Sequence, residues 1–301
     1  MAFLFELVPA LLAGLLLARR WPGLATRLAP LMVRYGVPFS VMGLLLRAGV
    51  DWRFADVLAL ALGMVAVGLL LVGRWLRAPV EQLGAVVGNT AYFGIPAALA
   101  LLPADVIGYS VSYDLAATLL TWSLGPVLIG AQGLRPRLLI ASLLSSPAIR
   151  GLAAALLVQL TPWRDPLAAL VWWPARVIVA LSLVMVGLRM APALTVPLPP
   201  RLWPAVVVKL LLFPLLALGV LQLLHLPAPA RAAVVLQAAT PTAVSVLLLA
   251  EAVQPGGDGA EDPVPATGGD GAGAADAASL VLWSTLLALL TVPLWARLLR
   301  G

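Results

Sequence analysis

The chain has 301 residues, of which 62% are hydrophobic and 11% are charged, whereas soluble domains carry roughly 25% charged residues. It contains no cysteine and one histidine, which excludes disulfides, thiolate metal sites and a multi-histidine metal centre. Long apolar runs with few charges indicate an integral membrane protein. The formal net charge of +6 is therefore attributed to arginines at cytoplasmic loop ends and not to a nucleic-acid partner.

Taken in chain order, the apolar runs predict an all-α integral membrane protein with ten transmembrane helices. The predicted spans are residues 2–18, 29–46, 54–73, 83–102, 105–130, 138–160, 166–188, 202–224, 231–252 and 277–296. No basic segment precedes the first run, so this run is expected to stay in the membrane rather than be cleaved as a signal peptide.

The second half of the chain resembles the first half. Residues 34–47 and 176–189 share the pattern R-x5-S-x6-R at an offset of 142 residues. Residues 116–123 and 277–284 share five of eight positions at an offset of 161. A chance match of apolar segments is the alternative explanation, but two matches in the same order favour a repeat.

The repeat divides the chain into a first unit at 1–133 and a second unit at 134–301, with five predicted helices in each. Because five is odd, the second unit enters the membrane in the opposite orientation, which gives a 5+5 inverted-topology repeat of the kind found in many secondary transporters. Arginines are more frequent in the loops on one side of the ten spans. The positive-inside rule therefore places both termini outside the cytoplasm.

The segment at about 254–276 differs in composition from the rest of the chain. It is rich in glycine and proline, and its only charged residues are acidic. Such a segment buries too little apolar surface to fold and is predicted to be a disordered acidic loop before the tenth span. Its acids do not have the spacing of a calcium-binding loop.

The fourth and ninth predicted helices are expected to be broken. Each has a proline near its middle, flanked by polar uncharged side chains, at 88–96 and 237–245. Proline removes a backbone donor, and unpaired backbone groups survive in a membrane only where protein or water satisfies them. The alternative is that these prolines only kink their helices, because the chain has 26 prolines in all.

Interrupted helices at corresponding places in two repeats point to a transporter's substrate site, and the free N–H groups of half-helices suit an anion. The candidate substrate-binding residues on these helices are Asn89, Thr90, Gly94, Pro96, Gln237, Thr240, Pro241 and Thr242. No residue is a candidate metal ligand or catalytic group.

Three further polar residues inside predicted spans are candidates. Ser40 and Ser182 are related by the repeat and could bind a ligand, or could donate to a carbonyl in their own helical turn. Asp114, on the fifth span, is a possible proton carrier, because ionisable residues within a membrane are functional candidates; the alternative is that it pairs with a basic residue. Lys209 is the only lysine, and extension of its side chain to the interface is as good an explanation as function.

Motifs of enzymes are missing from the sequence. There is no P-loop, no G-x-S-x-G, no H-E-x-x-H and no dinucleotide-binding fingerprint. The sequence therefore predicts neither an enzyme nor a bound cofactor, and transport would have to use an ion gradient or the membrane potential.

Residues 89–96, Asn-Thr-Ala-Tyr-Phe-Gly-Ile-Pro, resemble the N-x-G-F-x-G-x-P signature of the auxin efflux carrier family, whose bacterial members include malonate-type permeases. Other segments resemble this family in order, namely 122–125, 146–147, 181–187, 239–241 and 249–251. The sequence departs from the family pattern at Ala91, Ser146 and Thr240, and these differences put the substrate in doubt.

The resemblance implies ten helices in an inverted repeat with crossing, broken fourth and ninth helices. It implies a scaffold unit and a transport unit that move relative to each other, and a homodimer. Asn89, Gly94 and Pro96 would form one side of the crossover, and Pro241 with Thr240 and Thr242 the other side.

The sequence therefore predicts a secondary transporter, a permease of the cell (inner) membrane, that moves small organic acid anions by alternating access at the crossover. A sodium-coupled symporter of similar architecture and a non-transporting membrane sensor are the alternatives. Either protons or sodium could be the coupling ion. The sequence does not identify the substrate or the direction of transport.

Overall fold

The computed structural model describes residues 2–130, 146–191, 194, 197–252 and 272–299. All regular elements in these ranges are helices, which confirms the predicted all-α class. The α-helices are α1 (Ala2–Arg20), α2 (Leu24–Leu31), α3 (Val37–Ala48), α4 (Trp52–Val72), α5 (Pro79–Val86), α6 (Ile95–Leu101), α7 (Ile107–Leu128), α9 (Pro147–Gln159), α10 (Arg164–Met190), α11 (Trp203–Val207), α12 (Phe213–Gln222), α13 (Ala228–Ala238), α14 (Val244–Ala252) and α15 (Ala272–Leu298). Shorter turns are η1 (Met32–Gly36), η2 (Thr90–Gly94), η3 (Ala104–Val106), η5 (Pro200–Leu202) and η6 (Val208–Leu212).

Five helical segments in the described ranges are long and apolar enough to cross a membrane. They are Leu24–Ala48, Trp52–Val72, Arg164–Met190, Pro200–Gln222 and Gly273–Leu298, and each coincides with a predicted span. Long apolar helices of this kind indicate a protein embedded in a membrane. The other predicted spans fall on α1, α7, α9 and the two interrupted pairs α5–α6 and α13–α14. The predicted boundary at 133–134 lies outside the described residues.

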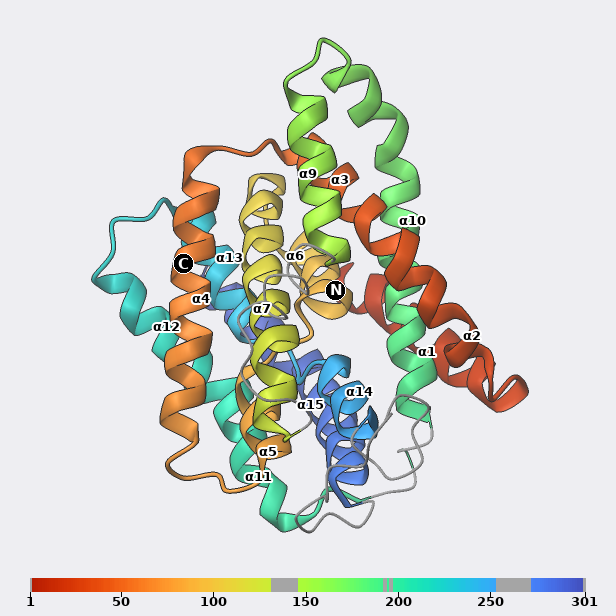
Figure 1. The fold of residues 1–301 in the computed structure, drawn as a ribbon, viewed down its shortest axis with the longest axis vertical. Coiled ribbons are helices and arrows are strands. Elements are labelled where there is room, and N and C mark those ends of the chain that lie inside the picture. Colours follow the sequence, from red (N-terminus) through yellow and green to blue (C-terminus); the bar gives the residue numbers. More distant parts are fainter. Residues whose placement is uncertain (1, 131–145, 192–193, 195–196, 253–271, 300–301) are drawn as a thin grey trace.

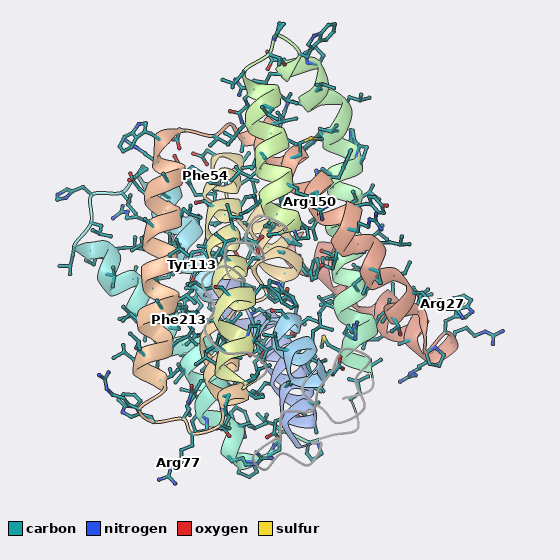
Figure 2. The ribbon with its side chains drawn as sticks, viewed as in Figure 1. Arg27, Phe54, Arg77, Tyr113, Arg150 and Phe213 are labelled. Carbon is teal, nitrogen blue, oxygen red and sulfur yellow. The ribbon has the colours of Figure 1, made fainter. Side chains whose placement is uncertain are left out.

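The helices form two groups that lie beside each other (Figure 1). One group contains α1, α2, α3, α9 and α10, and α9 and α10 extend beyond the other helices at one end. The other group contains α4, α7, α12 and α13, and both interrupted pairs lie in it, against α7 and α15. Tyr113 of α7 is buried inside this group, and Arg77 projects from the end opposite the α9–α10 connection (Figure 2).

Three π-helical turns in the described residues lie just before a proline. In each turn a backbone N–H bonds to the carbonyl five residues back, from Val37 to Met32, from Ile95 to Thr90 and from Phe213 to Val208. The residue that follows each of these donors is a proline. Proline lacks a donor and clashes with the carbonyl four residues back, and the wider π turn accommodates both effects. These interior prolines therefore sit inside continuous helical segments.

The predicted acidic loop at 254–276 is too long at its C-terminal end. Residues 254–271 lie outside the described part of the chain, but α15 already begins at Ala272. Asp276, in its second turn, accepts hydrogen bonds from both terminal nitrogens of Arg201, at 2.5 and 2.7 Å. The acidic composition of this stretch hid a helix start, because Arg201, which binds the carboxylate of Asp276, lies 75 positions away in sequence.

Glycine allows α1 and α10 to approach closely. A β-carbon on Gly14 would lie 2.9 Å from the Cα of Gly187, and one on Gly187 would lie 3.0 Å from the Cα of Gly14 and against the carbonyl oxygen of Leu11. These neighbours are backbone atoms and cannot rotate away. Small residues serve in this way between helices in membranes.

We expect Gly187→Ala to lower the stability of the purified protein, because the new methyl group forces α1 and α10 apart. Overpacking of this kind costs about 1–3 kcal/mol. Thermal unfolding in detergent measures the effect. Gly219→Ala on α12 is the matched control, since a β-carbon there meets nothing within 4 Å. Equal melting temperatures for the two variants would show that the helices adjust without cost.

Candidate functional site

The two interrupted pairs meet at their interruptions, which we call the junction (residues 87–89 and 239–243). Gly88 and Thr242 form an isolated antiparallel bridge. The N–H of Asn89 donates to the carbonyl of Pro241 at 2.7 Å, and the N–H of Ala243 donates to the carbonyl of Val87 at 3.1 Å. Backbone groups freed by each break are therefore satisfied by the other break, as a membrane interior requires.

The junction leaves no room for a side chain at Gly88. A β-carbon there would meet the hydroxyl of Thr240 and would lie 3.1 Å from the Nζ of Lys209. Side chains also satisfy the ends of the half-helices, because Thr242 donates to the carbonyl of Gly84 at 2.8 Å and Thr240 donates to that of Gln237 at 2.7 Å. Glycine and asparagine at the first break, and threonine and proline at the second, therefore allow this local structure.

A cavity of about 560 Å³ opens beside the junction, and we call it the central cavity. Its lining residues include Gly88, Asn89, Thr90, Ala91, Tyr92, Asp114, Thr118, Thr121, Trp122, Ser123, Ser146, Ala243, Val244, Ser245 and Leu248. These residues come from the junction, from η2, from α7, from the start of α9 and from the start of α14. The volume is that of a site for a small molecule, and its mixture of apolar walls with few polar groups is typical of such sites.

Two buried polar groups that line the central cavity have no hydrogen-bond partner among the described residues. They are the amide nitrogen Nδ2 of Asn89 and the hydroxyl of Ser146. Buried polar side chains are usually hydrogen-bonded. A donor left unpaired beside a cavity is a group that a bound molecule can satisfy.

The lining of the central cavity also contains a carboxyl group. The hydroxyl of Thr90 donates to Oδ1 of Asp114 at 2.5 Å, and both side chains are buried. Asp114 is the only acidic residue among the described residues that line the central cavity, and no Lys, Arg or His lines it in that part of the chain. A bound anion would therefore have to be stabilised by dipoles and hydrogen bonds.

Helix dipoles supply that stabilisation. The helical segment Thr90–Leu101 begins at the central cavity with Thr90, Ala91 and Tyr92, and α14 begins there with Val244. The N-terminus of a helix presents free N–H groups and a partial positive charge. Two such ends at one cavity favour a negatively charged group.

The structure places the predicted site residues in two different positions. Asn89, Thr90 and Asp114 line the central cavity. Six other predicted residues do not line it and are buried, namely Gly94, Pro96, Gln237, Thr240, Pro241 and Thr242. A β-carbon on Gly94 would overlap the side chains of Gln237 and Thr240, so Gly94 allows the two interrupted pairs to touch.

Ser40 and Ser182 line a separate small cavity, of about 20 Å³, that also contacts Asp114 and Tyr92. Both serines donate to a carbonyl in their own turn, Ser40 to Val37 at 3.1 Å and Ser182 to Val179 at 2.5 Å. A hydrogen bond within the serine's own helical turn is the alternative to ligand binding that the sequence also predicts for these two residues.

Several residues of the site were not candidates from the sequence. Ser146, Tyr92 and Trp122 line the central cavity, although in the sequence they stand out only as members of the segments that resemble the family pattern. Lys209 does not reach the membrane interface, because its side chain is fully buried and its Nζ donates to the carbonyl of Ala238 at 2.7 Å. The only sign of this burial in the sequence is that Lys209 stands in an apolar run, one helical turn before Phe213.

A comparison of the chain with models of known protein families finds no match, and a comparison with curated protein sequences finds none either.

Proposed function

We propose that this protein is a secondary transporter for small organic acids and that the central cavity is its substrate site. The observation that carries the proposal is the unpaired amide of Asn89, which faces a cavity where two half-helix N-termini meet. An amide donor and two positive helix ends form a binding site for a carboxylate. The motifs that resemble the auxin efflux carrier family support the same function.

The proposed architecture is a ten-span 5+5 inverted repeat in which the interrupted pairs are the crossing fourth and ninth helices. Backbone pairing between Gly88 and Thr242 supports this arrangement. In this proposal the group of α1, α2, α3, α9 and α10 is the scaffold, and the group that contains the junction moves against it. In this proposal the end of the molecule from which Arg77 projects (Figure 2) is the cytoplasmic side, as the positive-inside rule predicts, and both termini lie outside the cytoplasm.

The lining of the central cavity favours a substrate with one carboxylate over one with two. Helix ends carry about half an elementary charge each, and no cationic side chain from the described residues adds to them. A second carboxylate would be repelled by Asp114 and would find only neutral hydroxyl groups, such as that of Ser146, in the rest of the lining. We therefore propose a monocarboxylic acid with an apolar body as the substrate class.

We expect Asn89→Ala to weaken substrate binding, because the carboxylate loses its side-chain donor. Loss of a hydrogen bond to a charged group costs about 1.5–3 kcal/mol, and a binding constant changes tenfold for about 1.4 kcal/mol. Saturable uptake into proteoliposomes, measured for a panel of mono- and dicarboxylates with their neutral amides, gives the effect on the apparent affinity.

Ser110→Ala is the matched control for this experiment. Ser110 also has a buried hydroxyl without a partner among the described residues, but it does not line the central cavity. An equal loss of affinity in both variants would remove Asn89 from the site. Absence of saturable flux for every acid, in folded protein, would overturn the transporter proposal in favour of a different substrate class or a sensor.

A further inference from the structure

Lys209 lies in the interior of the second group of helices. It belongs to the π turn η6, its side chain is fully buried, and its Nζ donates to the carbonyl oxygen of Ala238 at 2.7 Å. The described residues form two ion pairs, Arg189–Glu251 and Arg201–Asp276, and Lys209 takes part in neither. No carboxylate therefore explains why a cation is held at this point.

The group that Lys209 contacts is the C-terminal end of a half-helix. Ala238 is the last residue of α13, and the last four carbonyls of a helix have no partner within it. These carbonyls carry a partial negative charge. The centre of the aromatic ring of Phe213 lies 5.1 Å from Nζ. The ring is a second group that favours a cation.

The corresponding end of α5 is satisfied by a neutral group. There the hydroxyl of Thr242 donates to the carbonyl of Gly84. At the end of α13 the hydroxyl of Thr240 likewise donates to the carbonyl of Gln237. The two half-helix ends are unequal because, among the described residues, the end of α13 also receives the side-chain nitrogen of Lys209. In broken transporter helices, half-helix C-termini and unwound carbonyls coordinate Na⁺ or H⁺.

We propose that Lys209 is a built-in cation that occupies the place of a coupling metal ion at the end of α13. The protein then binds no sodium there, and its stability and any transport are independent of sodium. The transport part of this statement rests on the proposed function, whereas the part on cation binding does not.

The position of Lys209 also connects it to the other interruption. A β-carbon on Gly88 would lie 3.1 Å from Nζ and 3.3 Å from the adjacent Cε. The ammonium group thus lies between the carbonyl end of α13 and the bridge formed by Gly88. Removal of the charge should affect both sides of the junction.

The test is the thermal stability of the purified protein in detergent, in sodium chloride and in choline chloride of equal concentration. The native protein is expected to melt at the same temperature in both salts. Lys209→Met keeps most of the side-chain volume but not the charge, and it is expected to melt at a lower temperature in both salts.

Lys209→Ala opens the space as well as removing the charge. It is expected to melt at a lower temperature in choline chloride and to regain stability with sodium. It is also expected to regain stability with n-propylammonium, which replaces the three methylenes and the ammonium group that alanine lacks. A purely packing role would be rescued by methionine and not by a small cation.

Three results would overturn the proposal. They are a native protein that sodium stabilises, a Lys209→Met variant as stable as the native protein, or a folded Lys209→Ala variant that no cation restores. If Lys209→Ala does not fold, the native protein and Lys209→Met still decide the question. None of these measurements needs a substrate, so a failure of the transporter proposal would appear separately, as absent uptake by the native protein.

Discussion

Replacing Gly94 by valine is expected to abolish uptake of the substrate. A β-carbon at this position would overlap the amide oxygen of Gln237 and the methyl group of Thr240, and valine adds two further carbons. The two interrupted pairs touch at this point, so the side chain would push them apart and break the bridge at the junction. Overpacking costs about 1–3 kcal/mol, enough to shift the junction away from the geometry that forms the central cavity.

The measurement is uptake into proteoliposomes together with the melting temperature of the same preparation. Gly63→Val on α4 is the control, because it makes the same change in a transmembrane helix where a β-carbon meets nothing within 4 Å. Normal uptake by Gly94→Val would show that contact between the interrupted pairs is not needed for transport.

Asp114→Asn is expected to uncouple transport from a proton gradient. Asp114 is buried at the wall of the central cavity, where it accepts the hydrogen bond from Thr90. Ionisable groups inside a membrane are expensive and commonly mark proton pathways. Asparagine keeps the shape and the hydrogen bond but cannot carry a proton. Accumulation driven by a pH gradient should be lost, whereas exchange of labelled for unlabelled substrate should persist.

Two variants separate this effect from a general loss of function. Thr90→Val removes the hydrogen bond but leaves the carboxyl group, so the accumulation that it retains should still depend on the pH gradient, even where its affinity for substrate is lowered. Asp56→Asn removes an exposed acid on α4 and should behave as the native protein. If Asp114→Asn still accumulates substrate in response to a pH gradient, another group carries the proton.

The sequence predicted the class of the fold and the two interruptions, because both follow from local chemistry. Apolar runs predict helices, and glycine, proline and hydroxyl side chains in the middle of such runs predict a break. Local chemistry did not predict the exact position of the first break. Pro96 lies inside α6, and the chain leaves the helix after Val86, because the π turn η2 accommodates the proline.

The sequence could not separate residues that face the central cavity from those that hold the junction together. Asn89 and Gln237 are both buried amides without a side-chain partner among the described residues, but only Asn89 lines the central cavity. The difference depends on how the two interrupted pairs meet, which involves residues about 150 positions apart in sequence. The role of Lys209 was hidden for the same reason, since its partner Ala238 belongs to another helix.

The bridge at the junction uses backbone atoms only, from Asn89 to Pro241 and from Ala243 to Val87. These hydrogen bonds do not involve the side chain of Asn89, whereas Gly88 must stay free of a side chain for the bridge to form. Side chains such as Asn89 and Ser146 can therefore be exchanged in a library of variants while the supporting frame stays intact. This makes the protein a suitable starting point for the redesign of substrate preference at a fixed architecture.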